Sequence, residues 1–151
     1  MQRASRISTG YLADSIRVIA LVGEHDLCTR QIVLAELERV TAPGVAVIVD
    51  LSAAEFIDST MLRILIIAHK RAESTVGTTL AVVVSLDSGP ARIFEVTDAR
   101  ALFPIFASLD EAIASSSHST LRTAGRGMTG TPHCTSGKDD HLDRRLPVVP
   151  A

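Results

Sequence analysis

The chain has 151 residues, of which 46% are hydrophobic and 21% are charged, so it is long enough for one domain with a sizeable core. Its formal net charge of −2 gives no electrostatic reason to bind a polyanion and argues against direct contact with nucleic acid. No apolar stretch is long enough to cross a bilayer, and the N-terminus lacks the apolar region of a signal peptide. We therefore expect a cytoplasmic protein without a membrane span.

The first half of the chain alternates between strand and helix patterns. A weak edge strand is predicted over Ile7–Tyr11, and a buried β-branched strand over Ile16–Val22. From Thr29, the predicted N-cap, apolar residues recur at helical spacing as far as the stop at Pro43. The run Val45–Leu51 is almost continuously apolar, which is typical of a strand covered on both faces.

The second half continues the alternation. A second helix is predicted from about Ser59, with Gly77 just past its end. The later elements are a strand over Thr79–Val84, a short helix over Ala91–Val96, a short strand over Pro104–Phe106 and a helix over Leu109–Ala114 capped by Ser108. Strands that alternate with helices predict an α/β fold, in which helices pack on a central sheet through right-handed crossovers.

The chain divides into a predicted domain, residues 1–117, and a predicted disordered tail, residues 118–151. The tail loses all hydrophobic periodicity and is rich in Ser, Thr, Gly and Pro. Residues 1–117 carry 14 acidic and 10 basic side chains, whereas residues 118–151 carry 3 acidic and 5 basic ones. We therefore expect a mildly acidic domain followed by a weakly basic tail.

Sequence motifs of catalysis and cofactor binding are missing. The chain has no phosphate-binding loop, no dinucleotide fingerprint and no nucleophile elbow. Its five histidines lack zinc-site spacing, and Cys28 and Cys134 lack metal or redox spacing. We therefore expect no metal, no cofactor and no enzyme. An enzyme that joins Ser59 to His25 or His69 is the least supported alternative.

The segment Asp50–Thr60, DLSAAEFIDST, is the most informative in the chain. It leaves a predicted buried strand and opens the second helix with the polar triplet Asp58, Ser59 and Thr60. A helix N-terminus presents unpaired N–H groups and partial positive charge, so a phosphate on a hydroxyl there finds donors waiting. The alternative interpretation is structural, because Asp58 or Ser59 can simply cap the helix.

Three separated blocks resemble the STAS domain of bacterial anti-sigma factor antagonists. The first is DLSAAEFIDST itself, the second is LVGEHD at Leu21–Asp26, and the third is FASLDEA at Phe106–Ala112. The blocks occur in the family's order, and the resemblance extends over about residues 5–117. It implies a four- to five-stranded mixed sheet with about four helices packed mainly on one face.

The resemblance also implies a phosphorylation switch in transcription regulation. Ser59 takes the phosphoacceptor position, and Asp26, Asp58, Thr60 and Met61 take partner-binding positions. The implied partners are an anti-sigma factor that is also a serine kinase, and a phosphatase that resets the switch. The unphosphorylated form binds the anti-sigma factor and frees the sigma factor, and the phosphorylated form dissociates from the anti-sigma factor.

Two features leave alternatives open. Met61 stands where the family usually has Gly after the two hydroxyl residues, and its bulk at the first turn of the helix can alter partner choice or end the phosphorylation cycle. STAS domains also serve as subunits of membrane transport complexes and as ligand-sensing modules without such a cycle. We expect a monomer or weak dimer in either case.

Overall fold

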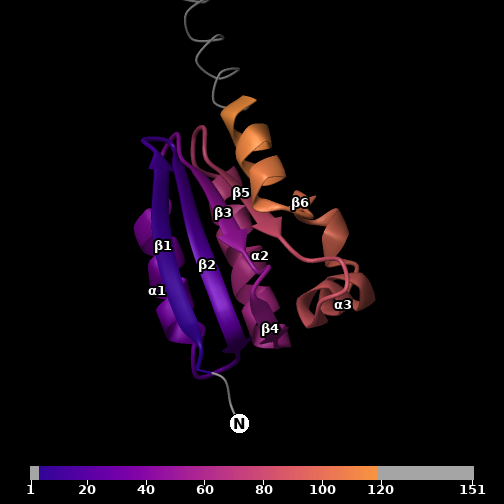
Figure 1. Ribbon diagram of the computed structural model, residues 1–151. Coiled ribbons are helices and arrows are strands. Elements are labelled where there is room, and N and C mark those ends of the chain that lie inside the picture. Colours follow the sequence, from indigo (N-terminus) through magenta and orange to yellow (C-terminus); the bar gives the residue numbers. More distant parts are fainter. Residues whose placement is uncertain (1–3, 119–151) are drawn as a thin grey trace, which may run out of the picture.

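Strands and helices alternate along residues 4–118, the part of the chain that the computed structural model describes (Figure 1). In chain order the elements are β1 (Arg6–Ala13), β2 (Ile16–His25), α1 (Arg30–Val40), β3 (Ala46–Asp50), β4 (Ala54–Ile57), α2 (Ser59–Glu73), β5 (Thr79–Val83), α3 (Gly89–Val96), η1 (Ala99–Ala101), β6 (Ile105–Phe106) and a helix over residues 109–118. The predicted α/β class with a mixed sheet is confirmed. The predicted tail lies outside the described residues, except for residue 118, which still belongs to the last helix.

The sheet follows the order β1-β2-β3-β5-β6, and β4 pairs with β2 off this path. Only β1 runs antiparallel to its neighbour, and every other pairing is parallel. Strand β3 ends its pairing with β2 at Ala20↔Asp50, and β4 begins its own at Gly23↔Ala54. The two short strands therefore lie end to end along the ten residues of β2.

Strand β4 is the one strand that the sequence patterns did not predict. It has only four residues, AEFI, and its ladder with β2 contains an irregularity between Gly23 and Glu24. So short a segment carries too few positions to show a period of two. Its existence depends on the length of β2, because the end of β2 that β3 leaves unpaired still has backbone groups that need partners.

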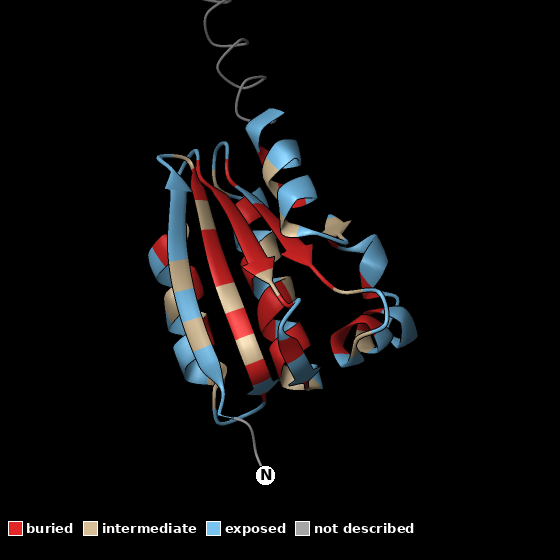
Figure 2. Ribbon diagram, viewed as in Figure 1, coloured by how far each residue is buried: buried red, intermediate tan, exposed pale blue. Residues whose placement is uncertain are grey.

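Side chains that alternate along the central strands supply two cores. Val47 and Val49 of β3 join the larger core, which includes buried residues of α1, α2 and α3, whereas Ala46 and Ile48 join the smaller core under the last helix. Figure 2 shows that β2, β3 and β5 are mostly buried and that β1 is mostly exposed. Three helices thus cover one face and one covers the other, as the resemblance implies.

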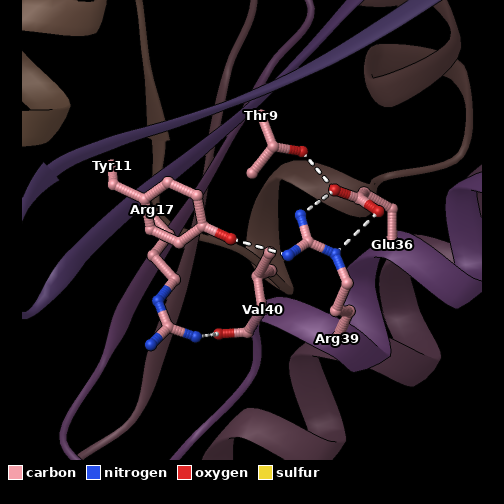
Figure 3. A network of polar contacts seen from close by, with 6 residues as sticks. All are labelled: Thr9, Tyr11, Arg17, Glu36, Arg39 and Val40. Carbon is pink, nitrogen blue, oxygen red and sulfur yellow. Dashed lines mark hydrogen bonds and ion pairs between the residues drawn. The ribbon is translucent and has the colours of Figure 1, made fainter.

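A polar network holds the edge strand β1 against α1 (Figure 3). Glu36 accepts hydrogen bonds from Arg39 and from the hydroxyl of Thr9, and Arg39 donates to the phenol oxygen of Tyr11 at 2.7 Å. These hydrogen bonds lower the pKa of Glu36 to about 2, and the one from Arg39 has the largest effect. The carboxylate therefore stabilises the fold above its unfolded pKa of about 4.5, and this contribution is lost as the pH falls towards 2.

Candidate functional site

Two segments of the chain meet at the carboxyl end of β2. The ladder between β2 and β4 ends with the pair His25↔Ile57, and the N–H of Asp58 donates to the carbonyl oxygen of His25 at 3.3 Å. Asp26 follows His25 and Ser59 follows Asp58. The register of this short ladder therefore brings Asp26 and Ser59, which are 33 residues apart in the sequence, to the same edge of the sheet.

Asp58 is the N-cap of α2. Its backbone is extended, with φ −94° and ψ 175°, and its Oδ1 accepts a hydrogen bond from the N–H of Met61 at 2.8 Å. The helix begins at Ser59, which is exposed, and Thr60 beside it is half-buried. Because Asp58 supplies the cap, the helix start does not need the hydroxyl of Ser59, which stays open to solvent at the positive end of the helix.

Replacing the cap is expected to destabilise the protein by about 1 kcal/mol. Asp58→Ala removes the acceptor for the N–H of Met61, and loss of an N-cap side chain costs about 0.5–2 kcal/mol. The free energy of unfolding, measured by urea denaturation, reports the loss. Asp58→Asn is the matched control, since its amide oxygen still caps the helix, and equal losses for the two variants would contradict the capping role.

The loop between β2 and α1 is ordered by its own side chains. The carboxylate of Asp26 accepts a hydrogen bond from the N–H of Cys28 at 2.9 Å, and the hydroxyl of Thr29 donates to the carbonyl oxygen of Asp26 at 3.1 Å. Thr29 occupies the N-cap position as predicted, but its side chain makes no cap hydrogen bond to α1. It closes the loop instead, and this loop presents Asp26 on the exposed surface.

The prediction that Met61 contacts a partner is corrected by the structure. The Met61 side chain is 0% exposed and belongs to the larger core, among the helices on one face of the sheet. The first turn of α2 rotates this position inward, whereas Ser59 points outward. Met61 therefore influences a partner only through the packing of α2.

Two exposed apolar side chains in the segments that meet at the end of β2 were missed by the sequence interpretation. Leu27, in the loop after β2, is 62% exposed, and Phe56, in β4, is 47% exposed. The available signal was their position, since each lies within two residues of a predicted site aspartate. Together with Asp26, Asp58 and Ser59 they form what we call the switch surface, the acidic, apolar and hydroxyl side chains of the two segments that meet at the end of β2.

The two histidines considered as catalytic partners of Ser59 are engaged elsewhere. His25 is 0% exposed, and its Nε2 lies 3.1 Å from the carbonyl oxygen of Val22. His69 is ten residues along α2 from Ser59, about 15 Å of helix rise, and its ring packs edge-on against Phe103 at 5.2 Å. Neither arrangement resembles a nucleophile activated by an adjacent base.

The burial of His25 predicts a loss of stability at acid pH. Desolvation lowers the pKa of His25 from its usual 6.5, although the hydrogen bond to Val22 and the charge of Asp26 offset part of the effect. Below pH 6.5 the unfolded chain binds a proton at this residue that the folded chain resists, so the free energy of unfolding falls as the pH decreases.

This effect can be isolated by comparing wild type with His25→Leu between pH 6.5 and 5. The wild type is expected to lose stability more steeply, by at most about 1.4 kcal/mol per pH unit, the limit for one proton. Urea denaturation at a series of pH values gives both slopes. Equal slopes would mean that the buried imidazole titrates in the fold as it does in the unfolded chain.

Neither a metal-ligand cluster nor a membrane-spanning helix is present in the described part of the chain. Within residues 4–118 no group of three or more His, Cys, Asp or Glu side chains is placed to hold an ion. No helix there combines the length and the apolar character that a bilayer span requires. Cys28 is exposed, and the second cysteine lies outside the described residues.

Comparisons with known proteins agree with this geometry. The family model of the STAS domain matches residues 11–112. The fold is similar to the crystal structure of an anti-sigma factor antagonist from Mycobacterium paratuberculosis, with a TM-score of 0.64 and 28% identity over 75% of this chain and 94% of that one. A search of curated proteins found no match.

Two further solved structures share the fold at lower identity. The unphosphorylated form of the anti-sigma factor antagonist SpoIIAA matches with a TM-score of 0.59 and 17% identity, over 72% of this chain and 93% of that one. The phosphorylated form of the Bacillus cell fate determinant SpoIIAA matches with a TM-score of 0.56 and 17% identity, over 73% and 98% of the two chains.

Proposed function

The chain belongs to the STAS domain family, and on this premise we propose that it is a cytoplasmic anti-sigma factor antagonist switched by phosphorylation of Ser59. The unphosphorylated form binds an anti-sigma factor that is also a serine kinase, and thereby releases a sigma factor. Phosphorylation ends the binding, and a phosphatase restores it. The protein acts by binding and catalyses no reaction.

The observation that carries the proposal is the placement of Ser59. Its side chain is exposed at the first residue of α2, and the helix is capped by the preceding Asp58 through the N–H of Met61. A kinase can therefore reach the hydroxyl without unfolding the helix. A phosphate added there meets the positive end of the helix dipole, which favours an anion.

The switch surface supports binding as well as modification. Leu27 and Phe56 offer exposed apolar area in the two segments that meet at this edge of the sheet, and such area is typical of protein contacts when polar groups surround it. Two negative groups, Asp26 and Asp58, lie at the same edge. A phosphate would add about 1.5 to 2 negative charges among them, at the centre of the contact. A local change of charge is sufficient, and no change of fold is needed.

Phosphosite mapping tests the proposal. The chain is incubated with ATP and the kinase that a pull-down with the unphosphorylated chain retrieves, and the labelled residue is identified by mass spectrometry. Wild type and Thr60→Ala are expected to be labelled, and Ser59→Ala is expected to stay unlabelled. Labelling that survives Ser59→Ala would exclude Ser59 as the acceptor.

The same pull-down separates this function from the alternative. A kinase that is captured by the unphosphorylated chain, and released when the chain is phosphorylated, supports the antagonist. A membrane ATPase captured without any kinase supports a subunit of a transport complex and contradicts the antagonist.

A further inference from the structure

A continuous groove runs between α1 and α2, on the outer side of the helical layer. It consists of two cavities of about 610 and 720 Å³ that share Leu34, Ile67 and Arg71. Ile67 is 39% exposed and Leu34 is half-buried, so the floor is apolar. Ser59 lines one end of this groove, which therefore continues from the switch surface.

The groove is more basic than the rest of the domain, which is acidic. Residues 1–117 contain 10 basic and 14 acidic side chains. Four of the basic ones, Arg30, Arg63, Lys70 and Arg71, line the groove, but only one acidic one does, Glu38. Glu38 pairs with Arg71 across the groove. We call this feature the basic groove.

Two of these arginines lie at the Ser59 end. Arg63 follows Ser59 by four residues in α2, so the two side chains project from the same face one turn apart. Arg30, the first residue of α1, lines the same cavity from the other helix. Arg63 is exposed and Arg30 is half-buried. Both arginines therefore line the cavity that Ser59 also lines, where a phosphate on its hydroxyl would lie.

We propose that the basic groove holds an acidic amphipathic helix of the partner protein, and that phosphate on Ser59 displaces this helix by binding Arg63 and Arg30. The inference rests on the proposed function, because it adds the form of the partner's contact and the means of its release. The phosphate thus acts as an internal competitor for the charges that the partner needs.

The shape and chemistry of the groove favour a helix as its occupant. A groove between two helices accepts the apolar face of a third, with anchors at helical spacing. Helix α1, with 11 residues, is about 16 Å long, which matches three turns of a bound helix. The apolar floor suits leucine-like anchors, and the basic rim suits carboxylates. No aromatic residue lines either cavity, so the stacking platform typical of single-stranded nucleic acid binding is missing there.

Competition follows from the geometry of the anion. A phosphate carries more charge than a carboxylate and accepts paired hydrogen bonds from guanidinium groups. Once covalently attached to Ser59, it stays beside Arg63 and Arg30 at a high effective concentration. A carboxylate of the partner must then compete with the attached phosphate for the arginines, and it is also repelled by the negative charge of the phosphate. Binding of the phosphate and binding of the acidic helix are therefore mutually exclusive at this end.

The phosphate contact is tested without any partner, by ³¹P NMR of the full chain with phosphoserine inserted at residue 59 during translation. The second ionisation of a free phosphoserine has a pKa of about 6. Arg63→Gln and Arg30→Gln are each expected to raise the phosphate's pKa relative to the wild-type chain by about half a unit. Arg92→Gln, an exposed arginine of α3, is expected to leave it unchanged. Since the helix N-terminus acts equally in all four chains, unchanged values in both groove variants would overturn the contact.

The docking of an acidic helix is tested with the isolated anti-sigma factor. Ile67→Glu puts a negative charge, the sign of the acidic helix, on the apolar floor about 12 Å of helix rise from Ser59. It is expected to weaken binding of the unphosphorylated chain at least about 10-fold. Val96→Glu is the matched control, because Val96 is 82% exposed in α3, and it is expected to bind like wild type. Circular dichroism and the melting temperature verify that both variants fold.

The outcomes separate this inference from the proposed function. If Ile67→Glu binds with wild-type affinity while Ser59 phosphorylation still abolishes binding, the docking of a helix in the basic groove is overturned. The phosphorylation switch is then left intact. If sedimentation detects a dimer of the wild-type chain and finds Ile67→Glu to be monomeric, the groove binds a second copy of this chain. That result would overturn the proposal that it binds a partner helix. Failure of Ser59 to accept phosphate from the kinase overturns the proposed function, whereas the ³¹P experiment still reports on the two arginines.

Discussion

Phosphorylation of Ser59 is expected to weaken binding of the anti-sigma factor at least about 100-fold, which corresponds to about 2.7 kcal/mol. The dianion would lie on the switch surface, which also includes the exposed apolar side chains of Leu27 and Phe56. A partner that covers these side chains must remove water from the phosphate, and the desolvation of a charged group is costly. Like-charge repulsion from any carboxylate of the partner adds to this cost. Isothermal titration calorimetry with modified and unmodified chain gives the two affinities.

Two variants extend this comparison. Ser59→Ala keeps the surface neutral at this residue and is expected to bind within about threefold of wild type, because one exposed hydroxyl contributes little. Ser59→Asp carries one charge on a shorter side chain, so it is expected to bind with intermediate affinity. Phosphorylated and unmodified chains of equal affinity would show that the modification does not control this contact.

Truncation of Met61 is expected to lower the free energy of unfolding by about 2–5 kcal/mol, the range for methionine-to-alanine changes in a core. The side chain is 0% exposed and belongs to the core that joins α2 to the central strands. Met61→Ala removes its contacts and leaves a cavity that close-packed neighbours fill only in part. Urea denaturation measures the change as a lower midpoint at an unchanged slope.

A matched substitution separates packing from partner choice. Met61→Leu conserves most of the volume and is expected to cost less than about 1.5 kcal/mol. Both variants keep the exposed surface of Ser59, so Met61→Leu is expected to bind the anti-sigma factor like wild type. A Met61→Ala variant as stable as wild type would contradict the packing role, and a binding defect in fully folded Met61→Leu would show that the packing of α2 affects partner choice.

The site could be predicted in part, because local chemistry determined some of its residues. A polar triplet that includes Ser59, before a run of helical apolar positions, predicts a helix start, and α2 begins at Ser59. The same local pattern offered Asp58 and Ser59 as caps, and the structure assigns the cap to Asp58. Thr29 is the N-cap residue of α1, as predicted, but its hydroxyl donates to the backbone of Asp26 and makes no cap hydrogen bond to the helix. Two acceptable partners for one hydroxyl cannot be ranked from sequence.

The burial of Met61 could not be predicted from the sequence pattern. In the sequence, Met61 appears beside two hydroxyl residues at the opening of a helix, which suggested an exposed contact. In the fold, the helix lies across the sheet so that this position faces the core and Ser59 faces solvent. A helix rotates 100° per residue, so adjacent residues can differ completely in burial, and only the packing of the helix determines which of them is exposed.

The sequence by itself determined the α/β class, the order of the long strands and helices, and the hydroxyl at a helix start, because these depend on periodicity and capping within short windows. Tertiary structure alone decided the pairing of β4 with β2, the approach of Asp26 to Ser59 and the gathering of four basic side chains in one groove. The physical reason is that each of these brings together residues from separate elements. Their proximity depends on strand register and helix packing, which minimise the free energy of the whole core and are not encoded in any single segment.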